Sequence, residues 1–239
     1  MRRARKNSRP TNRLLASLPD DAYQSLSRHL EDVPLKLKQR IFEPDHPINA
    51  VYFPQRGSMI SLVTPMQDGS VVEAATVGYE GMVGIGVYLE AVHVHYSAFC
   101  QMPGRALRIE AGIFRREMDA SAAIRTLMHR YTQALIIQLT QGLACNSLHT
   151  LGERCARWLL MTADRAGTDT FPLTQVFLAQ MLGVRRASVT VVAGMLQQAG
   201  LIRYSRGKMT LLDRRRLEEA SCECYGVIKR EVDQLMGGG

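Results

Sequence analysis

The segment from Leu173 to Thr190 limits the possible folds of this chain more than any other. It runs Leu-Thr-Gln-Val-Phe-Leu-Ala-Gln-Met-Leu-Gly-Val-Arg-Arg-Ala-Ser-Val-Thr. Thr174 is suited to cap a helix, because its hydroxyl can accept a hydrogen bond from a free N–H group of the first turn. Gly183 permits the left-handed backbone of a sharp turn, and a second helix is expected to begin near Arg185. The segment therefore predicts two helices joined by a tight turn.

The outward face of the second predicted helix carries side chains that could contact a partner. With Val189, Val192 and Leu196 in the core, the outward residues at its front are Arg186, Ala187, Thr190 and Val191. A helix that lies in a DNA major groove contacts bases from its N-terminal turns, and an arginine there can bond two acceptors of guanine. The alternative is an ordinary helical hairpin with solvated arginines.

The next segment, residues 200–213, favours DNA binding over that alternative. Leu201 and Ile202 supply one predicted strand and Met209 and Leu211 a second, with the basic tip Arg206-Gly207-Lys208 between them. Basic groups at such a tip are placed to neutralise phosphates and to set the register on DNA. The two helices and the hairpin together predict a winged helix-turn-helix.

The charge distribution points in the same direction. The chain has 239 residues and a formal net charge of +8; residues 1–16 hold six Arg or Lys and no acid, and residues 165–216 hold nine against two acids. Such clusters are typical of nucleic-acid binding, although a merely soluble basic surface would also produce them. No run approaches the ~20 apolar residues that span a bilayer, and the basic N-terminus lacks the apolar segment of a secretory signal. We expect a cytoplasmic protein without a membrane partner.

The first half of the chain predicts a β domain followed by a long helix. Short alternating runs with turn residues between them predict strands at 51–53, 59–64, 71–76 and 96–109. Beyond Phe114 the pattern becomes helical, and one stripe recurs at steps of three and four: Ile124, Leu127, Tyr131, Leu135 and Gln138. The stripe could pack on its own β domain or against a second copy. We favour self-association, because a two-stranded seam uses this spacing.

The predicted fold class is α+β. It comprises an N-terminal β-roll (a jelly roll like a cyclic-nucleotide-binding domain), a long dimerisation helix and a C-terminal winged helix-turn-helix. The predicted boundaries are a basic arm at 1–12, the β-roll at 13–117, the dimerisation helix at 118–149, the DNA-binding domain at 150–225 and a tail at 226–239.

Residues 173–196 and 200–213 resemble the Crp/Fnr family of transcription regulators, and the likeness covers nearly the whole chain. Its most specific parts are LTQ-x(3)-AQMLGVRRASVT-x(5)-L and GLI-x(4)-G-x(1)-MTLLD. The resemblance implies a homodimer in which the β-roll senses a signal and the winged helix binds palindromic promoter DNA, with RNA polymerase as a further partner. It implies a transcription factor and not an enzyme.

The resemblance also implies which residues contact DNA. Thr174 and Gln175 match positions that touch phosphate, and Arg186 matches a base-reading arginine. Ala187 and Val191 stand where many relatives carry a glutamate and a second arginine, so we expect a different half-site. The full predicted set is Thr174, Gln175, Arg185, Arg186, Ser188, Thr190, Arg203, Arg206 and Lys208.

The family's nucleotide pocket matches Gly84, Ile85, Gly86 and His95 here, which form the predicted effector pocket. Ile85 stands in place of the glutamate that holds the ribose, and Val94 and His95 lie near the family's Arg-Ser pair. A buried phosphate without a cation would lose its charge-assisted bonds. We therefore expect a signal other than cyclic AMP, or none.

Cysteine and histidine leave other chemistry open. The five cysteines are an odd number, which favours reduced thiols over a disulfide framework, and none precedes Cys100, where the iron–sulfur cluster of Fnr-type relatives would require them. His93 and His95 could contact a metal or haem, but exposed strand histidines are the simpler interpretation. Cys145 and His149 would suit zinc together with Cys222 and Cys224 if the two segments met. The alternative is buried, unreactive thiols, and we assign no metal and no cofactor.

Two other functions remain to be weighed. An enzyme could use Cys145 and His149 as nucleophile and base, but the chain offers no third orienting residue, glycine-rich phosphate loop or paired carboxylates. A general DNA-compacting protein would also be basic. The sequence leaves open the effector, the operator, the sign of regulation and the chemistry of the four Cys and His residues.

Overall fold

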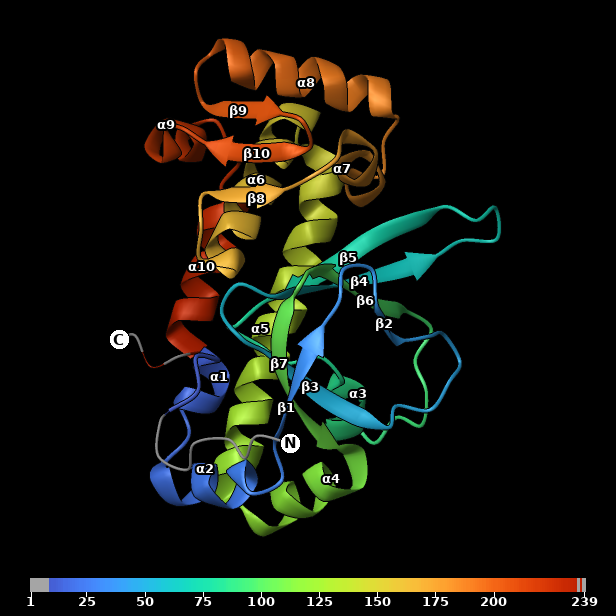
Figure 1. Cartoon of the computed structure of the whole chain (residues 1–239), viewed down its shortest axis with the longest axis vertical. Coiled ribbons are helices and arrows are strands. Elements are labelled where there is room, and N and C mark those ends of the chain that lie inside the picture. The colour runs from blue at the N-terminus through green and yellow to red at the C-terminus, as the bar shows by residue number, and fades with distance from the viewer. Residues whose placement is uncertain (1–8, 236, 238–239) are drawn as a thin grey trace.

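The computed structural model describes residues 9–235 and residue 237. Residues 1–8 lie outside the described part, and with them most of the predicted basic arm, as do residues 236, 238 and 239 at the glycine-rich end. Figure 1 shows an elongated molecule, with the β domain in its lower half and a second domain of helices and short strands above it.

The β domain consists of two antiparallel sheets with strand orders β1-β7-β3 and β2-β6-β4-β5. Its strands are β1 (Glu31–Leu35), β2 (Arg40–Phe42), β3 (Ala50–Pro54), β4 (Met59–Pro65), β5 (Val71–Val77), β6 (Ser97–Met102) and β7 (Gly104–Glu110). Its helices are α1 (Arg13–Ala16), α2 (Asp20–Ser27), α3 (Ile85–Tyr88) and α4 (Ala111–Ala120). Both sheets contribute to one core that includes Phe53, Ile60, Ala98 and Ile109. The predicted β-roll is confirmed, with two further strands, β1 and β2.

Helix α5 (Ala122–Leu148) follows the β domain and runs along most of the molecule (Figure 1). The predicted stripe lies on its buried face, and all five members are at most 9 % exposed. The Tyr131 hydroxyl donates to the Met82 carbonyl at 2.7 Å, and the Gln138 amide donates to the Thr76 carbonyl at 3.2 Å. The preference for self-association through this stripe is therefore wrong, because the stripe packs on its own β domain.

The second domain begins with α6 (Leu151–Ala166), whose N-terminus is closed by a capping box. The Thr150 hydroxyl accepts from the Glu153 backbone N–H, and the Glu153 carboxylate accepts from the Thr150 backbone N–H. The remaining elements are β8 (Thr170–Pro172), α7 (Gln175–Leu182), α8 (Arg186–Gln198), β9 (Ile202–Ser205), β10 (Lys208–Leu211) and α9 (Arg214–Glu219). Strand β8 joins the predicted hairpin, so the sheet has the order β8-β10-β9.

Helix α10 (Cys224–Leu235), the last helix among the described residues, packs along α5 and α6. The sequence predicts a tail from residue 226, and the structure corrects this boundary. Helices α9 and α10 are separate, and the segment assigned to the tail continues α10 to Leu235. Its apolar face explains this, since Tyr225, Ile228 and Leu235 are buried.

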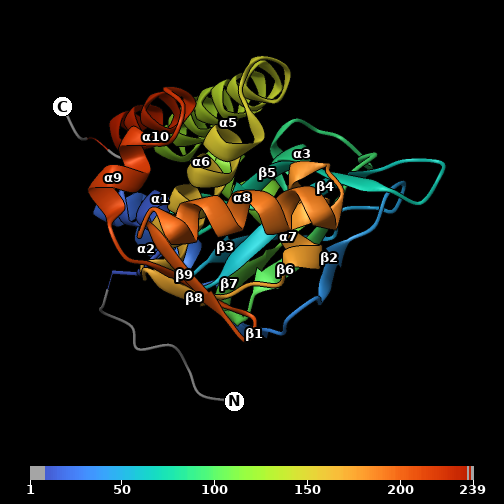
Figure 2. The ribbon, with the colours of Figure 1, turned by 90° about the horizontal axis from the view of Figure 1, so that it is seen from above.

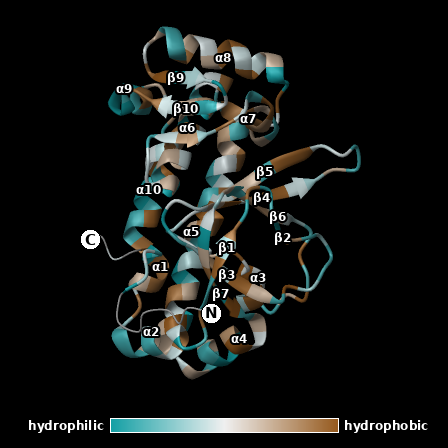
Figure 3. Cartoon of the chain, in the orientation of Figure 1, coloured by the Kyte–Doolittle hydropathy of each residue, from teal (hydrophilic) through white to brown (hydrophobic). Residues whose placement is uncertain are grey.

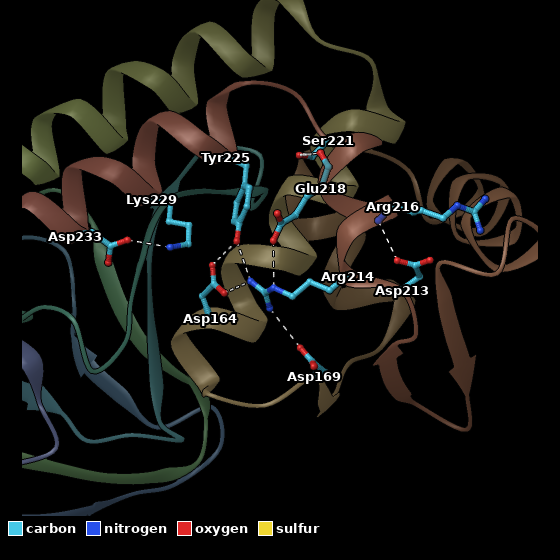
Figure 4. Close-up of polar contacts among 10 residues, drawn as sticks. All are labelled: Asp164, Asp169, Asp213, Arg214, Arg216, Glu218, Ser221, Tyr225, Lys229 and Asp233. Atoms are coloured by element: carbon cyan, nitrogen blue, oxygen red, sulfur yellow. Dashed lines mark hydrogen bonds and ion pairs between the residues drawn. The ribbon is translucent and has the colours of Figure 1, made fainter. Parts of the chain in front are cut away.

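Arg214 ties three of these helices together (Figure 4). At the start of α9, its guanidinium pairs with Asp164 of α6 and with Glu218 one turn further on, and it donates to the Tyr225 hydroxyl of α10 at 2.8 Å. The Tyr225 hydroxyl also donates to Asp164 at 2.9 Å. Every side chain in this network has a charged or polar partner. The network therefore holds α6, α9 and α10 in place relative to one another.

The two domains share a continuous interface. Met59, Val63 and Met102 of the β domain belong to the same apolar core as α6 and α7. Polar contacts extend it: Arg165 of α6 pairs with Glu80 at 2.8 Å and donates to Gln138 of α5 at 2.8 Å. Within the described residues, no single helix is long and apolar enough to cross a membrane; α7 and α8 reach that length only as a pair bent by 106°.

Candidate nucleic-acid interface

Helices α7 and α8 form the predicted helix-turn-helix. The Thr174 hydroxyl accepts from the Phe177 N–H at 3.1 Å and so caps α7, as the sequence predicts. Gly183 ends α7 with φ 65°, in the left-handed region that a residue with a side chain rarely adopts. Helix α8 then starts at Arg186, and the bend between the two helices is 106°. This angle lies within the range of helix-turn-helix motifs.

Helix α8 is the outermost element of the molecule at this end, as the view from above shows (Figure 2). Val189, Ala193 and Leu196 face inward and are buried, as predicted for Val189 and Leu196, while Val192 is half-buried. Arg186 and Thr190, on the opposite side of the first two turns, are exposed. Hydrophilic residues stand out at both ends of α8 in Figure 3.

The wing lies beside α8. Its tip is the two-residue turn Arg206-Gly207, with φ 50° and 74°, which is the type of turn that suits a tight hairpin. Leu201, Ile202, Met209 and Leu211 are buried, while Arg203, Arg206 and Lys208 are exposed. The apolar residues thus anchor the strands to the domain, and the basic side chains are presented to solvent.

Five cations predicted to meet DNA gather on this end of the molecule: Arg185, Arg186, Arg203, Arg206 and Lys208. All five are exposed, and in the described part of the chain none of them forms an ion pair with a carboxylate. Their charge is therefore available to an anionic partner. Ser188 is exposed on the same first turns of α8, and Gln175 is half-buried at the start of α7.

Two contacts that the sequence did not reveal hold this surface together. The Thr190 hydroxyl donates to the Gln175 side-chain oxygen at 2.8 Å, so these two predicted contact residues are bonded to each other. The Tyr204 backbone N–H of the wing donates to the Gln197 side-chain oxygen at 2.8 Å, which links the wing to α8. Neither pair has a local sequence signal, because the partners come from different elements.

Three of the predicted effector residues are buried in the β domain, and the fourth, His95, is exposed. Gly84, Ile85 and Gly86 open helix α3 inside the β domain, and a side chain at Gly86 would meet the Ile48 side chain at 2.7 Å and Val94 at 3.3 Å. His95 lies on the surface instead, with its Nδ1 at 2.6 Å from an Asp45 carboxylate oxygen. His93 stacks on His95 at 5.6 Å between ring centroids, and both are exposed.

The two arginines of β7 are each paired with an acid of β1. Arg105 is exposed and its guanidinium donates to Asp32 at 2.7 Å. Arg108 pairs with Glu31 at 3.1 Å on the same sheet. A cavity of about 210 Å³ lies instead between β5, α5 and α6, with Glu73, Gln138 and Trp158 in its lining.

The geometry defines a class: a β-roll coupled through a long helix to a winged helix-turn-helix. Residues 153–220 match the family described as the Crp-like helix-turn-helix domain. No curated protein sequence matches the chain. Residues 153–220 thus form a Crp-like helix-turn-helix domain, and the chain as a whole has the fold of the solved Crp/Fnr regulators described next.

Solved structures of that family share the fold over most of the chain. A transcriptional regulator of the Crp/Fnr family from Eubacterium rectale has a TM-score of 0.67 at 20 % identity, over 87 % of this chain and 96 % of its own. A Crp-family regulator from Thermus thermophilus has 0.66 at 22 % identity, over 79 % and 96 %. The global regulator CLP of Xanthomonas campestris has 0.66 at 15 % identity, over 82 % and 100 %. Members of this family are regulators and not enzymes.

Proposed function

We propose that this regulator binds double-stranded promoter DNA as a homodimer, with α8 in the major groove and the wing on the flanking backbone. The observation that carries the proposal is a group of five exposed cations, none of which pairs with a carboxylate among the described residues: Arg185, Arg186, Arg203, Arg206 and Lys208. Arg186 sits in the first turn of α8, where side chains of a recognition helix meet base edges. The wing cations sit where they would meet phosphates.

Dimerisation would use a second face of α5, which lies about a third of a turn around the helix from the buried stripe. Ile136, Leu139 and Leu143 recur there at steps of three and four and are 49 %, 38 % and 70 % exposed. Exposed apolar side chains in such a row are typical of a helix that pairs with another helix. A dimer supplies two copies of α8, so the operator is expected to be an inverted repeat with half-sites about one helical turn, ~34 Å, apart.

The half-site should differ from that of relatives with a glutamate and a second arginine in the recognition helix. Ala187 and Val191 occupy those places and are exposed. Neither side chain donates or accepts a hydrogen bond, so base discrimination would fall mainly to Arg186, Ser188 and apolar contacts. RNA polymerase is the further partner proposed for a regulator bound at a promoter, and the cytoplasm, where that DNA lies, is its proposed location.

The signal would be something other than cyclic AMP. Ile85 cannot accept a bond from a ribose hydroxyl, and Ile48 and Val94 fill the space beside Gly86. Related folds serve different signals: the CLP regulator of Xanthomonas campestris is described as responsive to c-di-GMP.

Genome-wide mapping of bound DNA, followed by footprinting on the recovered motif, tests this function. The expected result is a protected inverted repeat near promoters that a scrambled sequence of equal length does not compete for. A single unpaired half-site would contradict the dimer. Uniform coverage without a motif would favour the alternative of a DNA-compacting protein.

A further inference from the structure

Four metal-binding side chains from distant parts of the chain meet where α5 ends. Cys145 lies in the last turns of α5 and His149 is its C-terminal cap, while Cys222 just precedes α10 and Cys224 is the first residue of that helix. Their ligand atoms all lie within 4.8 Å of one another. The sequence allowed a zinc site only if these two segments came together in the fold. In the structure they do.

The spacing of these atoms fits one tetrahedral ion. The Sγ atoms of Cys145 and Cys222 are 3.4 Å apart, and Cys224 Sγ is 3.6 Å from His149 Nδ1. Ligand atoms around zinc, with Zn–S bonds of about 2.3 Å in a tetrahedron, lie about 3.8 Å apart. The gap thus suits a single ion, whereas an iron–sulfur cluster would need its inorganic core between the ligands.

The three cysteines are set apart from the apolar interior. All three are buried, yet they form a cluster of their own that belongs to neither of the two large cores. The other two cysteines, Cys100 and Cys155, lie inside those cores among apolar side chains. Buried thiols that only fill space would be expected to resemble the second kind.

The surroundings orient the ligands as outer partners do at metal sites. His149 Nε2 lies 3.2 Å from a Glu223 carboxylate oxygen, which leaves Nδ1 facing the thiols. Such carboxylate–histidine pairs fix the tautomer of a metal-binding imidazole. The Gln141 amide donates to Cys224 Sγ at 3.1 Å. Cys222 and Cys224 also stand at the N-terminus of the twelve-residue helix α10, whose dipole favours negative charge.

We propose that Cys145, His149, Cys222 and Cys224 bind one zinc ion in a structural Cys3His site that fastens the end of α5 to the start of α10. Four protein ligands leave no open position, which is the mark of a structural rather than a catalytic zinc site. Three soft thiolates and an imidazole are a ligand set that zinc accepts well. The site lies next to Thr150, where the DNA-binding domain begins, so the ion would fix the joint between the domains.

Metal analysis of the full chain tests the proposal. Protein produced in zinc-supplemented medium and purified with a thiol reductant is expected to hold about one zinc per chain. Cys222→Ser should lose it, and Cys155→Ser, which removes a buried thiol outside the cluster, should retain it. Glu223→Ala should retain the ion but bind it about tenfold or more weakly in competition with a chromogenic chelator.

A second measurement on the unaltered chain covers the case in which Cys222→Ser does not fold. Cobalt(II), added after zinc is removed by a chelator, should give the thiolate charge-transfer and ligand-field absorption of a tetrahedral site. Absence of both zinc and this absorption would overturn the proposal. So would a Cys145–Cys222 disulfide in the purified protein, iron with inorganic sulfide, or full zinc content in a folded Cys222→Ser. None of these readouts depends on DNA binding.

Discussion

Arg186 and Lys208 are both exposed cations, but they stand at different places on the proposed DNA surface. Arg186 opens α8, and Lys208 opens β10 beside the wing tip. Arg186→Ala is expected to lose about 1–3 kcal/mol of discrimination between the operator and scrambled DNA. Lys208→Ala is expected to weaken binding to the operator and to scrambled DNA by similar factors. It should also reduce the slope of log affinity against log salt concentration by about one unit. Binding titrations at several salt concentrations measure both.

Arg215→Ala is a matched control for that pair. Its side chain is an exposed arginine of the same domain that pairs with Glu219 on α9, which Figure 3 shows as a hydrophilic helix. Of the three variants, Arg215→Ala should change the affinity for DNA least. Equal loss of affinity on both DNAs for Arg186→Ala and Lys208→Ala would contradict the division of roles.

Glu73, at the interface between the domains, is expected to make the free energy of unfolding depend on pH. Its carboxylate accepts from the Trp158 indole N–H of α6 at 2.7 Å, and burial raises its pKa to about 7 in spite of that bond. Because the folded pKa lies above the unfolded one, this group's stabilising contribution is complete below about pH 4.5 and is lost as the pH rises through about 7. Glu73→Gln should therefore raise the free energy of unfolding at pH 8 by about 1–3 kcal/mol and change it little at pH 4.5.

Denaturant unfolding at pH 4.5, 6 and 8 tests this difference. Glu219→Gln removes one carboxylate from an exposed pair on α9 and serves as the control. An equal gain for Glu73→Gln at all three pH values would show that the effect does not come from titration of this carboxyl group.

Helix α5 illustrates what periodicity can and cannot predict. The spacing from Ile124 to Gln138 correctly predicted a long helix with one apolar face. It could not tell which surface would cover that face, because a β domain and a second helix bury the same pattern. The row from Ile136 to Leu143 has the same spacing on another face of the helix and was not recognised.

The exposed row of α5, formed by Ile136, Leu139 and Leu143, is the proposed dimer interface. Leu143→Glu places a charge among apolar side chains and is expected to weaken the dimer by about 2 kcal/mol, roughly 30-fold in dissociation constant. Sedimentation velocity over a range of protein concentrations measures it. Thr126→Glu adds the same charge at an exposed site outside the row and should leave the dimer intact. A dimer that survives Leu143→Glu unchanged would place the interface elsewhere.

The helix-turn-helix and its hairpin were the most predictable elements, because caps and turns are local. The Thr174 cap, the Gly183 turn and the Arg206-Gly207 tip follow from residues within a few positions of each other. Strand β8 was missed, since Thr170-Phe171-Pro172 is too short to show alternation. The pairing of Cys145 with Cys222 spans 77 positions, and no local pattern can bring such segments together.

The whole molecule predicts that cyclic AMP neither binds tightly nor changes affinity for DNA. The space beside Gly86 is filled, and Arg105 and Arg108 are each paired with an acid of β1. Loss of even one ionic partner typically moves a micromolar affinity of about 8 kcal/mol towards the millimolar range. Calorimetry with cyclic AMP, run beside DNA titrations with and without it, measures this. A micromolar dissociation constant would show that other residues rebuild the site.

The core shared by the two domains restricts how this regulator can be recombined. Met59, Val63 and Met102 are buried against α6 and α7, so separation at residue 150 would expose apolar surface on both pieces. Helix α10 would likewise lose α5, on which it lies. The DNA-binding domain therefore cannot simply be exchanged between regulators. A chimaera that joins it to another sensor domain must also carry the matching face of the β4–β5 hairpin. Evolution of a new signal in this lineage is expected to proceed by substitution within one co-adapted body and not by exchange of domains.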